Sequence, residues 1–372
     1  MKIAILTLPL HTNYGGILQA YALQTVLERM GHEVTHLQPK VEYPRLHSPF
    51  AMPFVWAKRL YKKLFLGDKN LPVFKHPYKW MREDTDRFIA ENLNCRFLKP
   101  EEWNENLAAE YDAVVVGSDQ VWRPLYSLDV TRFFTAFLGH SDIRRIAYAA
   151  SFGVDKNEFL EEQLASGREY LKLFSGISVR EESGIELCRD LFNVEAIKVL
   201  DPTMLLSIED YQRFAIIAPK SSGNLMVYVL DRTDETDSFI SRFAEEHDLN
   251  PFYANSKVGT SRNVNIPSGE RMQPPLENWL RGFLDADFIL TDSFHACVFS
   301  IIFHKPFGVF RNLSRGLSRI ESLLRPLGLM DRCIIGATVD LYKPIDWELI
   351  DNKIMQKAES SLVFLKRALN KR

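Results

Sequence analysis

The chain has 372 residues, 46% of them hydrophobic and 25% charged, a composition typical of globular proteins and unlike that of disordered or fibrous ones. This length predicts two domains, because one hydrophobic core rarely extends over so many residues. The formal net charge of −2 argues against a nucleic-acid partner. The four cysteines form no CxxC pair, so we expect no disulfide framework and a reducing compartment.

The first 40 residues predict a strand, a turn, a helix and a second strand. The apolar run at residues 2–8 predicts a buried strand, because it breaks at Pro9 and lacks the small-residue cleavage site of a signal peptide. The turn Asn13-Tyr14-Gly15-Gly16 leads into an amphipathic helix, and the second strand covers Glu33–Gln38. No stretch approaches the ~20 apolar residues that span a bilayer, and we expect a cytoplasmic protein.

The rest of the chain alternates between strands and helices, which predicts parallel sheets covered on both faces. Further strands of a first Rossmann-like domain, residues 1–201, are expected at Ala113–Ser118, Arg145–Phe152, Ile177–Arg180 and Ile197–Leu200. The strands of a second Rossmann-like domain, residues 202–345, are expected at Leu225–Leu230, Pro251–Ala254, Phe288–Thr291 and Phe307–Phe310. The amphipathic tail at 346–372 predicts a final helix that packs back on the first domain. We therefore predict an α/β fold of two doubly wound units facing a cleft.

Residues 40–82, part of an insertion at 40–100 in the first domain, carry an unusual charge. They hold ten Lys or Arg residues against two acids, a local net charge of +8, with aromatic residues interleaved. A helix over 54–65 would place an apolar face beside four basic residues, which are Lys58, Arg59, Lys62 and Lys63. Such a helix suits peripheral contact with the inner membrane surface or a lipid-linked anionic substrate. An ordinary surface helix packed on the core has the same pattern, so both interpretations stay open.

Two groups of residues in the first domain are candidates for binding the acceptor. The first lies at a helix start, whose free amides favour an anion, and the second has the features of a sugar-binding site. The first group opens the first helix, where glycines let a ligand approach the backbone, although a plain tight turn has the same sequence. The second group follows a buried strand, whose carboxyl end faces the ligand crevice in open α/β sheets. It offers a hydroxyl, a carboxylate, an amide and an aromatic platform, and its alternative is a solvated loop with a capping aspartate. The two groups are Asn13, Tyr14, Gly15 and Gly16, and Ser118, Asp119, Gln120 and Trp122.

Other strand–helix junctions place charged or titratable groups where an anion would bind. The guanidinium of Arg180 follows the strand Ile177–Val179 and matches a carboxylate or phosphate, or else it forms a structural ion pair with a neighbouring glutamate. His295 opens an apolar helix and is a candidate for proton transfer, although a lone histidine is more often structural. The candidate donor-binding residues are Ser293, Arg311, Arg315 and Arg319. The nine histidines show no HExxH or HxH spacing, so we expect no metal and no other cofactor.

Six motifs occur along the chain in a fixed order. They are Asn13-Tyr14-Gly15-Gly16 with Gln19, Gly117-Ser118-Asp119-Gln120, Ser151-Phe152-Gly153, Ser178-Val179-Arg180-Glu181, Asp201-Pro202-Thr203 and Thr291-Asp292-Ser293-Phe294-His295. Each motif alone is weak. Together they make the chain, from residue 2 to about residue 330, resemble the polysaccharide pyruvyl transferase family.

The resemblance implies a GT-B-like pair of Rossmann-type domains without a metal requirement. Family members transfer the enolpyruvyl group of phosphoenolpyruvate onto two hydroxyls of a sugar, forming a pyruvate ketal on an exopolysaccharide, capsule or cell-wall glycan. By this resemblance the catalytic histidine is His295 and the donor-binding arginine is Arg180, and we expect both to be catalytic. We assign the donor to the second domain and the glycan acceptor to the first. Characterised members carry Arg-Leu where this chain has Ser293-Phe294, so one of the three downstream arginines would supply the missing cation.

Two alternatives remain. One is a GT-B glycosyltransferase that uses a nucleotide-sugar donor, and the other is a non-catalytic polysaccharide-binding relative.

Overall fold

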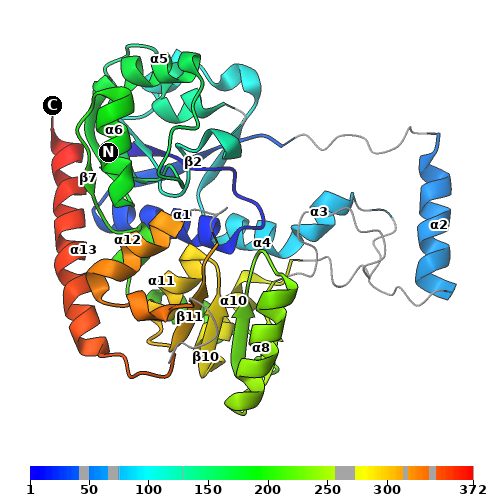
Figure 1. Cartoon of the computed structure of the whole chain (residues 1–372). Coiled ribbons are helices and arrows are strands. Elements are labelled where there is room, and N and C mark those ends of the chain that lie inside the picture. Colours follow the sequence, from blue (N-terminus) through cyan, green and yellow to red (C-terminus); the bar gives the residue numbers. More distant parts are fainter. Residues whose placement is uncertain are drawn as a thin grey trace.

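The computed structural model describes residues 1–41, 50–65, 74, 76–127, 129–255, 273–312, 317–334 and 341–371. In these residues two parallel sheets form two units that lie one above the other (Figure 1). The predicted Arg315 lies outside the described residues, as do parts of the basic segment 40–82.

The first unit is a seven-stranded parallel sheet in the order β3-β2-β1-β4-β5-β6-β7. The strands are β1 (Lys2–Leu6), β2 (Glu33–Pro39), β3 (Cys95–Leu98), β4 (Ala113–Val116), β5 (Arg144–Ala150), β6 (Phe174–Val179) and β7 (Ile197–Lys198). This order reverses direction between β1 and β4, and ligands of open α/β sheets bind beyond the strand ends at such a point. The helices beside the sheet are α1 (Tyr14–Arg29), α4 (Glu83–Asn92), α5 (Glu161–Tyr170) and α6 (Glu182–Phe192).

The second unit is a five-stranded parallel sheet in the order β12-β11-β10-β8-β9. Its strands are β8 (Leu225–Tyr228), β9 (Pro251–Tyr253), β10 (Phe288–Thr291), β11 (Phe307–Phe310) and β12 (Cys333–Ile334). The order reverses between β8 and β10, as in flavodoxin-like sheets. The helices of this half are α7 (Ile208–Ala215), α8 (Asp234–Glu246), α10 (Leu276–Asp285), α11 (Phe294–Ile302) and α12 (Leu317–Leu327).

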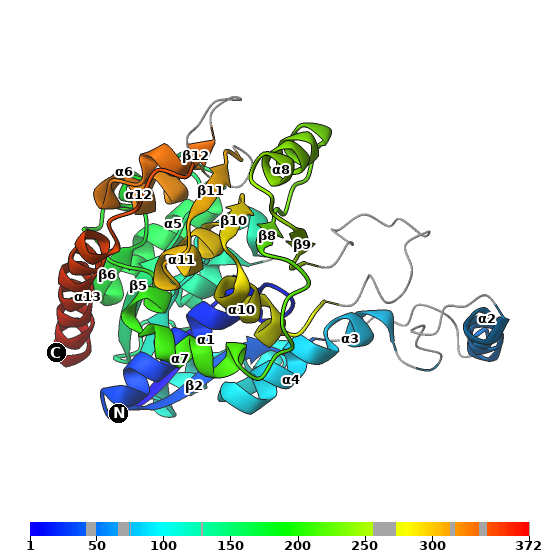
Figure 2. The same cartoon turned by 90° about the horizontal axis from the view of Figure 1, so that it is seen from below.

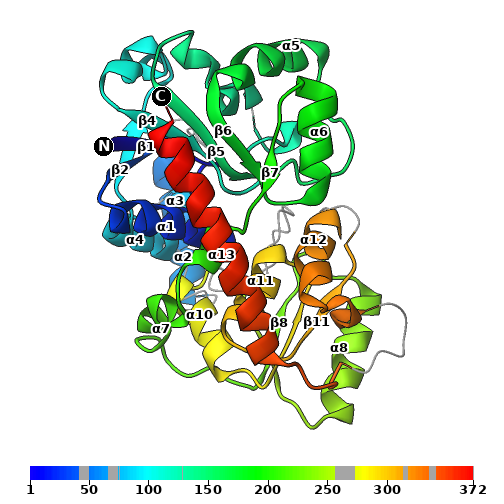
Figure 3. The same cartoon turned by 90° about the vertical axis from the view of Figure 1, so that its left-hand side faces the viewer.

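One hydrophobic cluster continues from the first unit into the second. Tyr14 at the start of α1 is fully buried, and its ring packs against Trp279 of α10 at 5.5 Å between centroids. The last helix, α13 (Trp347–Asn370), runs from the second unit to the first (Figure 3). There it packs on β5 and β6, and the Ser175 hydroxyl donates to the Ala368 carbonyl at 3.0 Å. These contacts bring the carboxyl edges of the two sheets together.

Helix α2 (Met52–Phe65) contains no buried residue. It stands apart from both sheets in two perpendicular views, beyond the short helix α3 (Pro77–Met81) (Figures 1 and 2). The interpretation of residues 54–65 as a helix that packs its apolar side on the core is therefore wrong for the described residues.

The predicted fold class is confirmed, since both units are doubly wound and the final helix returns to the first. Two strands were not predicted. β3 is a half-exposed edge strand without an apolar run, and β12 has two residues, so neither has the pattern that marks a buried strand.

Candidate active site

His295 lies in the first turn of α11, directly after the end of β10. The helix begins there because Ser293 caps it, its hydroxyl accepting from the Ala296 amide at 3.5 Å. The imidazole is 6% exposed and faces the first unit. A Cβ atom added to Gly15 would lie 2.2 Å from its Nδ1 atom. The glycine of α1 therefore leaves the space that the histidine of α11 occupies.

The carboxylate of Asp201 is the centre of the cluster. It is fully buried, and its Oδ2 accepts from Nη1 of Arg180 at 2.7 Å and from the Ser118 hydroxyl at 3.1 Å. The same oxygen lies 3.6 Å from Nε2 of His295. Its Oδ1 accepts from the amide and the hydroxyl of Thr203. Burial raises the pKa of Asp201, but His295 and Arg180 outweigh burial and hold this pKa well below its usual range. The group is therefore a carboxylate at neutral pH.

Arg180 and a second buried arginine, Arg319, lie close together at the ring of Phe294. Burial lowers the pKa of Arg180, and the charges of Asp201, Asp119 and Glu181 outweigh it and raise the pKa. Burial, followed by repulsion from Arg180, lowers the pKa of Arg319 to about 10. The two guanidinium carbons lie 4.3 and 5.9 Å from the ring centroid of Phe294. Like charges held together in the interior create a place where an anion would be stabilised.

Several polar atoms of this cluster carry no hydrogen bond. In the described part of the chain, Nε and Nη2 of Arg180 and Nε2 of His295 are buried without a hydrogen-bond partner. A buried donor without a hydrogen bond is one that a ligand would satisfy, although structural side chains such as Arg145 also have such atoms. The geometry therefore presents donors and a titratable ring to a small guest molecule.

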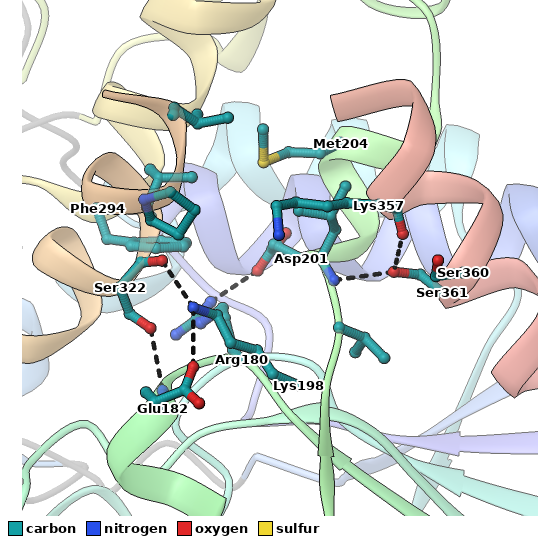
Figure 4. A pocket seen from close by; sticks show the side chains of 15 residues that line it. Arg180, Glu182, Lys198, Asp201, Met204, Phe294, Ser322, Lys357, Ser360 and Ser361 are labelled. Carbon is teal, nitrogen blue, oxygen red and sulfur yellow. Dashed lines mark hydrogen bonds and ion pairs between the residues drawn. The ribbon is translucent and has the colours of Figure 1, made fainter. Parts of the chain in front are cut away.

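A cavity of about 370 Å³ adjoins the cluster. Figure 4 shows Arg180, Asp201 and Phe294 among its lining, together with Lys198 of β7 and Lys357 of α13. Lys198 forms an ion pair with Glu182 at 3.3 Å. The three cations of the lining outnumber its two acids, Glu182 and Asp201, which favours an anionic ligand.

A protein-family model described as polysaccharide pyruvyl transferase matches residues 13–314. The chain belongs to this family. The match includes Gly15, Arg180, Asp201 and His295, so these four residues lie in the part of the chain that is characteristic of these transferases, whereas Arg319 lies just beyond it. Among curated proteins, no relative matches the sequence.

Similarity to solved structures supports the fold of this family member. The UDP-GlcNAc 2-epimerase of Neisseria meningitidis has a TM-score of 0.50 at 11% identity, covering 99% of this chain and 94% of the epimerase. The UGT89C1 protein of Arabidopsis thaliana has a TM-score of 0.50 at 8% identity, covering 99% of this chain and 98% of the other. Both similarities are to the two-domain GT-B-like architecture.

The acceptor residues predicted in the first domain have different environments. Asn13 caps α1, and Asp119 lies 3.6 Å from Arg180 and lines a small cavity with Asn13 and Gly16. Ser118 and Gln120 are buried. Ser118 positions Asp201, and Gln120 accepts from Arg123 at 3.4 Å.

Two of these acceptor predictions are wrong. Trp122 is fully buried among Phe134 and Phe152, and its Nε1 donates to the Phe133 carbonyl, so it offers no aromatic platform. Tyr14 is likewise buried, and its hydroxyl donates to the Pro274 carbonyl. Both rings belong to hydrophobic cores, where burial of the apolar ring decides their position.

The donor-side predictions are also divided. Arg319 is buried near Phe294 and Arg180, whereas Arg311 is exposed, and neither is among the residues that line the cavity. Capping α11 accounts for the Ser293 side chain. The alternative that Arg180 pairs with Glu181 or Glu182 is wrong, because its carboxylate partners are Asp201 and Asp119.

Sequence reasoning did not assign a role to Asp201, Lys198 or Lys357. Asp201 was noted only as a domain boundary and as part of a family motif. Its position just beyond the carboxyl end of β7 is the signal that would have marked it as a candidate site residue. The sequence around Lys357 does not predict that this side chain lines the cavity, because only the tertiary packing of α13 brings it there.

No cluster of three or more His, Cys, Asp or Glu residues that would hold a metal occurs within the described ranges. Among the helices of those ranges, none is long and apolar enough to cross a membrane.

Proposed function

We propose that the chain transfers the enolpyruvyl group of phosphoenolpyruvate to two hydroxyls of a sugar, forming a pyruvate ketal on an exopolysaccharide, capsule or cell-wall glycan. The observation that carries this proposal is the cluster of His295, Arg180 and Arg319 at the junction of the two units. The buried donors of Arg180 and His295 that make no hydrogen bond among the described residues, together with the neighbouring cations, match a small molecule with a carboxylate and a phosphate. Neither a metal nor another cofactor takes part in the proposed reaction.

The chemistry needs only proton transfer and charge stabilisation. A proton is added to the methylene carbon of phosphoenolpyruvate, and the first sugar hydroxyl oxygen bonds to the adjacent carbon as it loses its proton. The bond from that carbon to the phosphate oxygen then breaks, phosphate leaves with the electron pair, and the second hydroxyl oxygen bonds to the same carbon as it loses its proton. His295 would move the protons, and the arginines would hold the carboxylate and the departing phosphate. The Asp201 carboxylate would orient the side chains of Arg180 and His295 and would balance their positive charge.

The cavity beside Arg180 supports the donor part of the proposal. Arg319 would replace the arginine that other members carry in place of Ser293, because it reaches the same cluster from α12. Lys198 and Lys357 would add to the attraction of an anion. The rival donor is a nucleotide sugar, since the meningococcal epimerase was solved with UDP-GlcNAc. The second rival is a polysaccharide-binding relative without catalysis.

Thermal stabilisation distinguishes these functions. We expect phosphoenolpyruvate to raise the melting temperature, because a ligand that binds the folded state adds ~2.7 kcal/mol to the free energy of unfolding at a concentration of one hundred times its Kd. UDP is the control and should have no effect. With a glycan primer, phosphate release should accompany the loss of phosphoenolpyruvate. Stabilisation by UDP alone would favour the nucleotide-sugar donor, and glycan binding without phosphate release would favour the non-catalytic relative.

We further propose that α2 holds the enzyme at the cytoplasmic membrane surface, where a lipid-linked acceptor would be found. Its apolar residues Phe54, Tyr61, Leu64 and Phe65 are exposed, and they recur at helical spacings on one side. The four basic residues of the helix, with no acid among its residues, complement anionic headgroups. An exposed aromatic face of this kind is typical of helices that lie in the membrane interface.

Reversing these four charges should release the protein from anionic vesicles. Each basic residue near an anionic surface contributes about 1 kcal/mol, so glutamate at positions 58, 59, 62 and 63 should weaken binding by at least tenfold. Sedimentation with vesicles of phosphatidylglycerol and phosphatidylcholine measures this. Reversal of four exposed lysines outside α2, at Lys156, Lys172, Lys220 and Lys366, is the control matched in charge. A wild-type protein that ignores such vesicles at low salt would contradict the proposal.

A further inference from the structure

A second cavity lies at the carboxyl ends of β1 and β2, away from the donor cluster. Its volume is about 270 Å³. The side chains that face it from the connecting loops are Trp103, Tyr126, Ser127, Asp129, Arg132 and Phe133. This is the position, beyond the strand ends beside the switch point, where open α/β sheets bind their ligands.

Aromatic rings dominate this cavity, and their surroundings hold them in place. Trp103 is half-buried, its ring meets Phe137 edge-on at 5.3 Å, and the guanidinium of Arg132 lies 4.4 Å from its centroid. Tyr126 is 39% exposed, with the guanidinium of Arg123 4.7 Å from its ring. Rings that are already ordered lose little conformational entropy when a ligand packs on them.

The charges of the lining do not suit a small anion. Arg132 and Asp129 bring one charge of each sign, so the cavity offers no net attraction to phosphoenolpyruvate. A hydroxyl, a carboxylate and a guanidinium around aromatic rings instead match a ligand with apolar C–H faces and many hydroxyls. That is the chemistry of a pyranose ring. The cavity size also fits a small molecule rather than a peptide segment.

A chain of contacts joins this cavity to the donor cluster. Thr7 lines the cavity, and its hydroxyl donates to the Ser118 carbonyl at 3.1 Å. The same hydroxyl oxygen accepts from the Gln19 side-chain amide at 2.9 Å. Pro9 lines both this cavity and the smaller one that contains Asp119. Asp119 in turn lies 3.6 Å from Arg180. A glycan seated at Trp103 would therefore extend toward the donor along the switch point of the first sheet.

We infer that the cavity bounded by Trp103 and Tyr126 binds a sugar ring of the glycan acceptor. This inference rests on the proposed function for the identity of the glycan as acceptor, but the binding of a sugar can be tested without turnover. In this inference Trp103 and Tyr126 provide the aromatic surface for a sugar ring that the buried Trp122 does not provide.

The test measures binding of p-nitrophenyl glycosides of common hexoses and N-acetylhexosamines by saturation-transfer NMR and titration. Trp103→Ala should weaken binding of the glycoside preferred by the wild type by about tenfold, because stacking on an aromatic ring is lost. Trp103→Phe should restore part of it. Tyr126→Ala, at a more exposed position, should act in the same direction. Phosphoenolpyruvate affinity should change less than twofold in all three variants.

Trp347→Ala is the matched control. Trp347 is also half-buried and stacks on His304, but it is not among the residues that line this cavity. It should leave glycoside binding unchanged. Unchanged binding in both Trp103→Ala and Tyr126→Ala, or no glycoside binding to the wild type at 20 mM, would overturn the inference. UDP binding that depends on Trp103 would overturn it in favour of a nucleotide. Trp103-dependent glycoside binding without phosphoenolpyruvate turnover would preserve the sugar site while refuting the proposed function.

Discussion

Replacement of His295 by alanine should lower kcat by about 10²–10⁴-fold, the usual contribution of a positioned acid or base. His295 supplies the imidazole of the cluster, and its Nε2 makes no hydrogen bond within the described residues but lies 3.6 Å from the Asp201 carboxylate. His295→Gln should not recover the rate, because an amide hydrogen-bonds but does not exchange protons at neutral pH. Steady-state kinetics normalised to folded protein, with a melting curve for each variant, measures the effect.

His36 provides a matched control for this experiment. It is a fully buried histidine in β2, and burial lowers its pKa to about 3, so it stays neutral near pH 7. His36→Ala should lower the melting temperature through the cavity it creates and leave kcat per folded molecule unchanged. If His295→Ala behaved like His36→Ala, the proton-transfer role of His295 would be refuted.

Arg180→Lys should raise the KM for phosphoenolpyruvate by about 10- to 100-fold. Lysine keeps the charge that balances Asp201, but it loses the planar fork, whose Nε and Nη2 make no hydrogen bond to the described residues. Hydrogen bonds to charged groups contribute about 1.5–3 kcal/mol, which corresponds to this change in KM. Lysine is preferred to alanine here, because removing one partner of a buried ion pair destabilises the fold.

Arg145→Lys is the control for that substitution. Arg145 is also fully buried, yet its guanidinium donates to the carbonyls of Leu138, Gly139 and Ser141 and reaches no part of the cluster. It should lower the melting temperature without altering KM. An Arg180→Lys enzyme with unchanged KM and reduced stability would show that Arg180 is structural.

The local pattern of the sequence was sufficient to predict most elements of the fold. Runs of buried apolar residues such as Val114–Val116 and Phe288–Leu290 have a strand length and are separated by amphipathic helices, which predicts parallel doubly wound sheets. The same local pattern located Arg180 and His295, because each follows a strand and opens or precedes a helix. Those positions lie at the ligand-binding edge of any such sheet.

What lies next to those residues was decided by tertiary structure. Gly15 is a turn glycine in sequence, and only the docking of α11 on α1 makes it the space for His295. Tyr14 and Trp122 each follow the end of a strand, as binding residues do, but packing against rings from distant parts of the chain buries them. Asp201 joins Arg180 and His295 because three chain segments, more than 20 residues apart, converge on one carboxylate. Spacing along the chain describes one element at a time, whereas an active site between two sheets depends on strand order and on how the units pack.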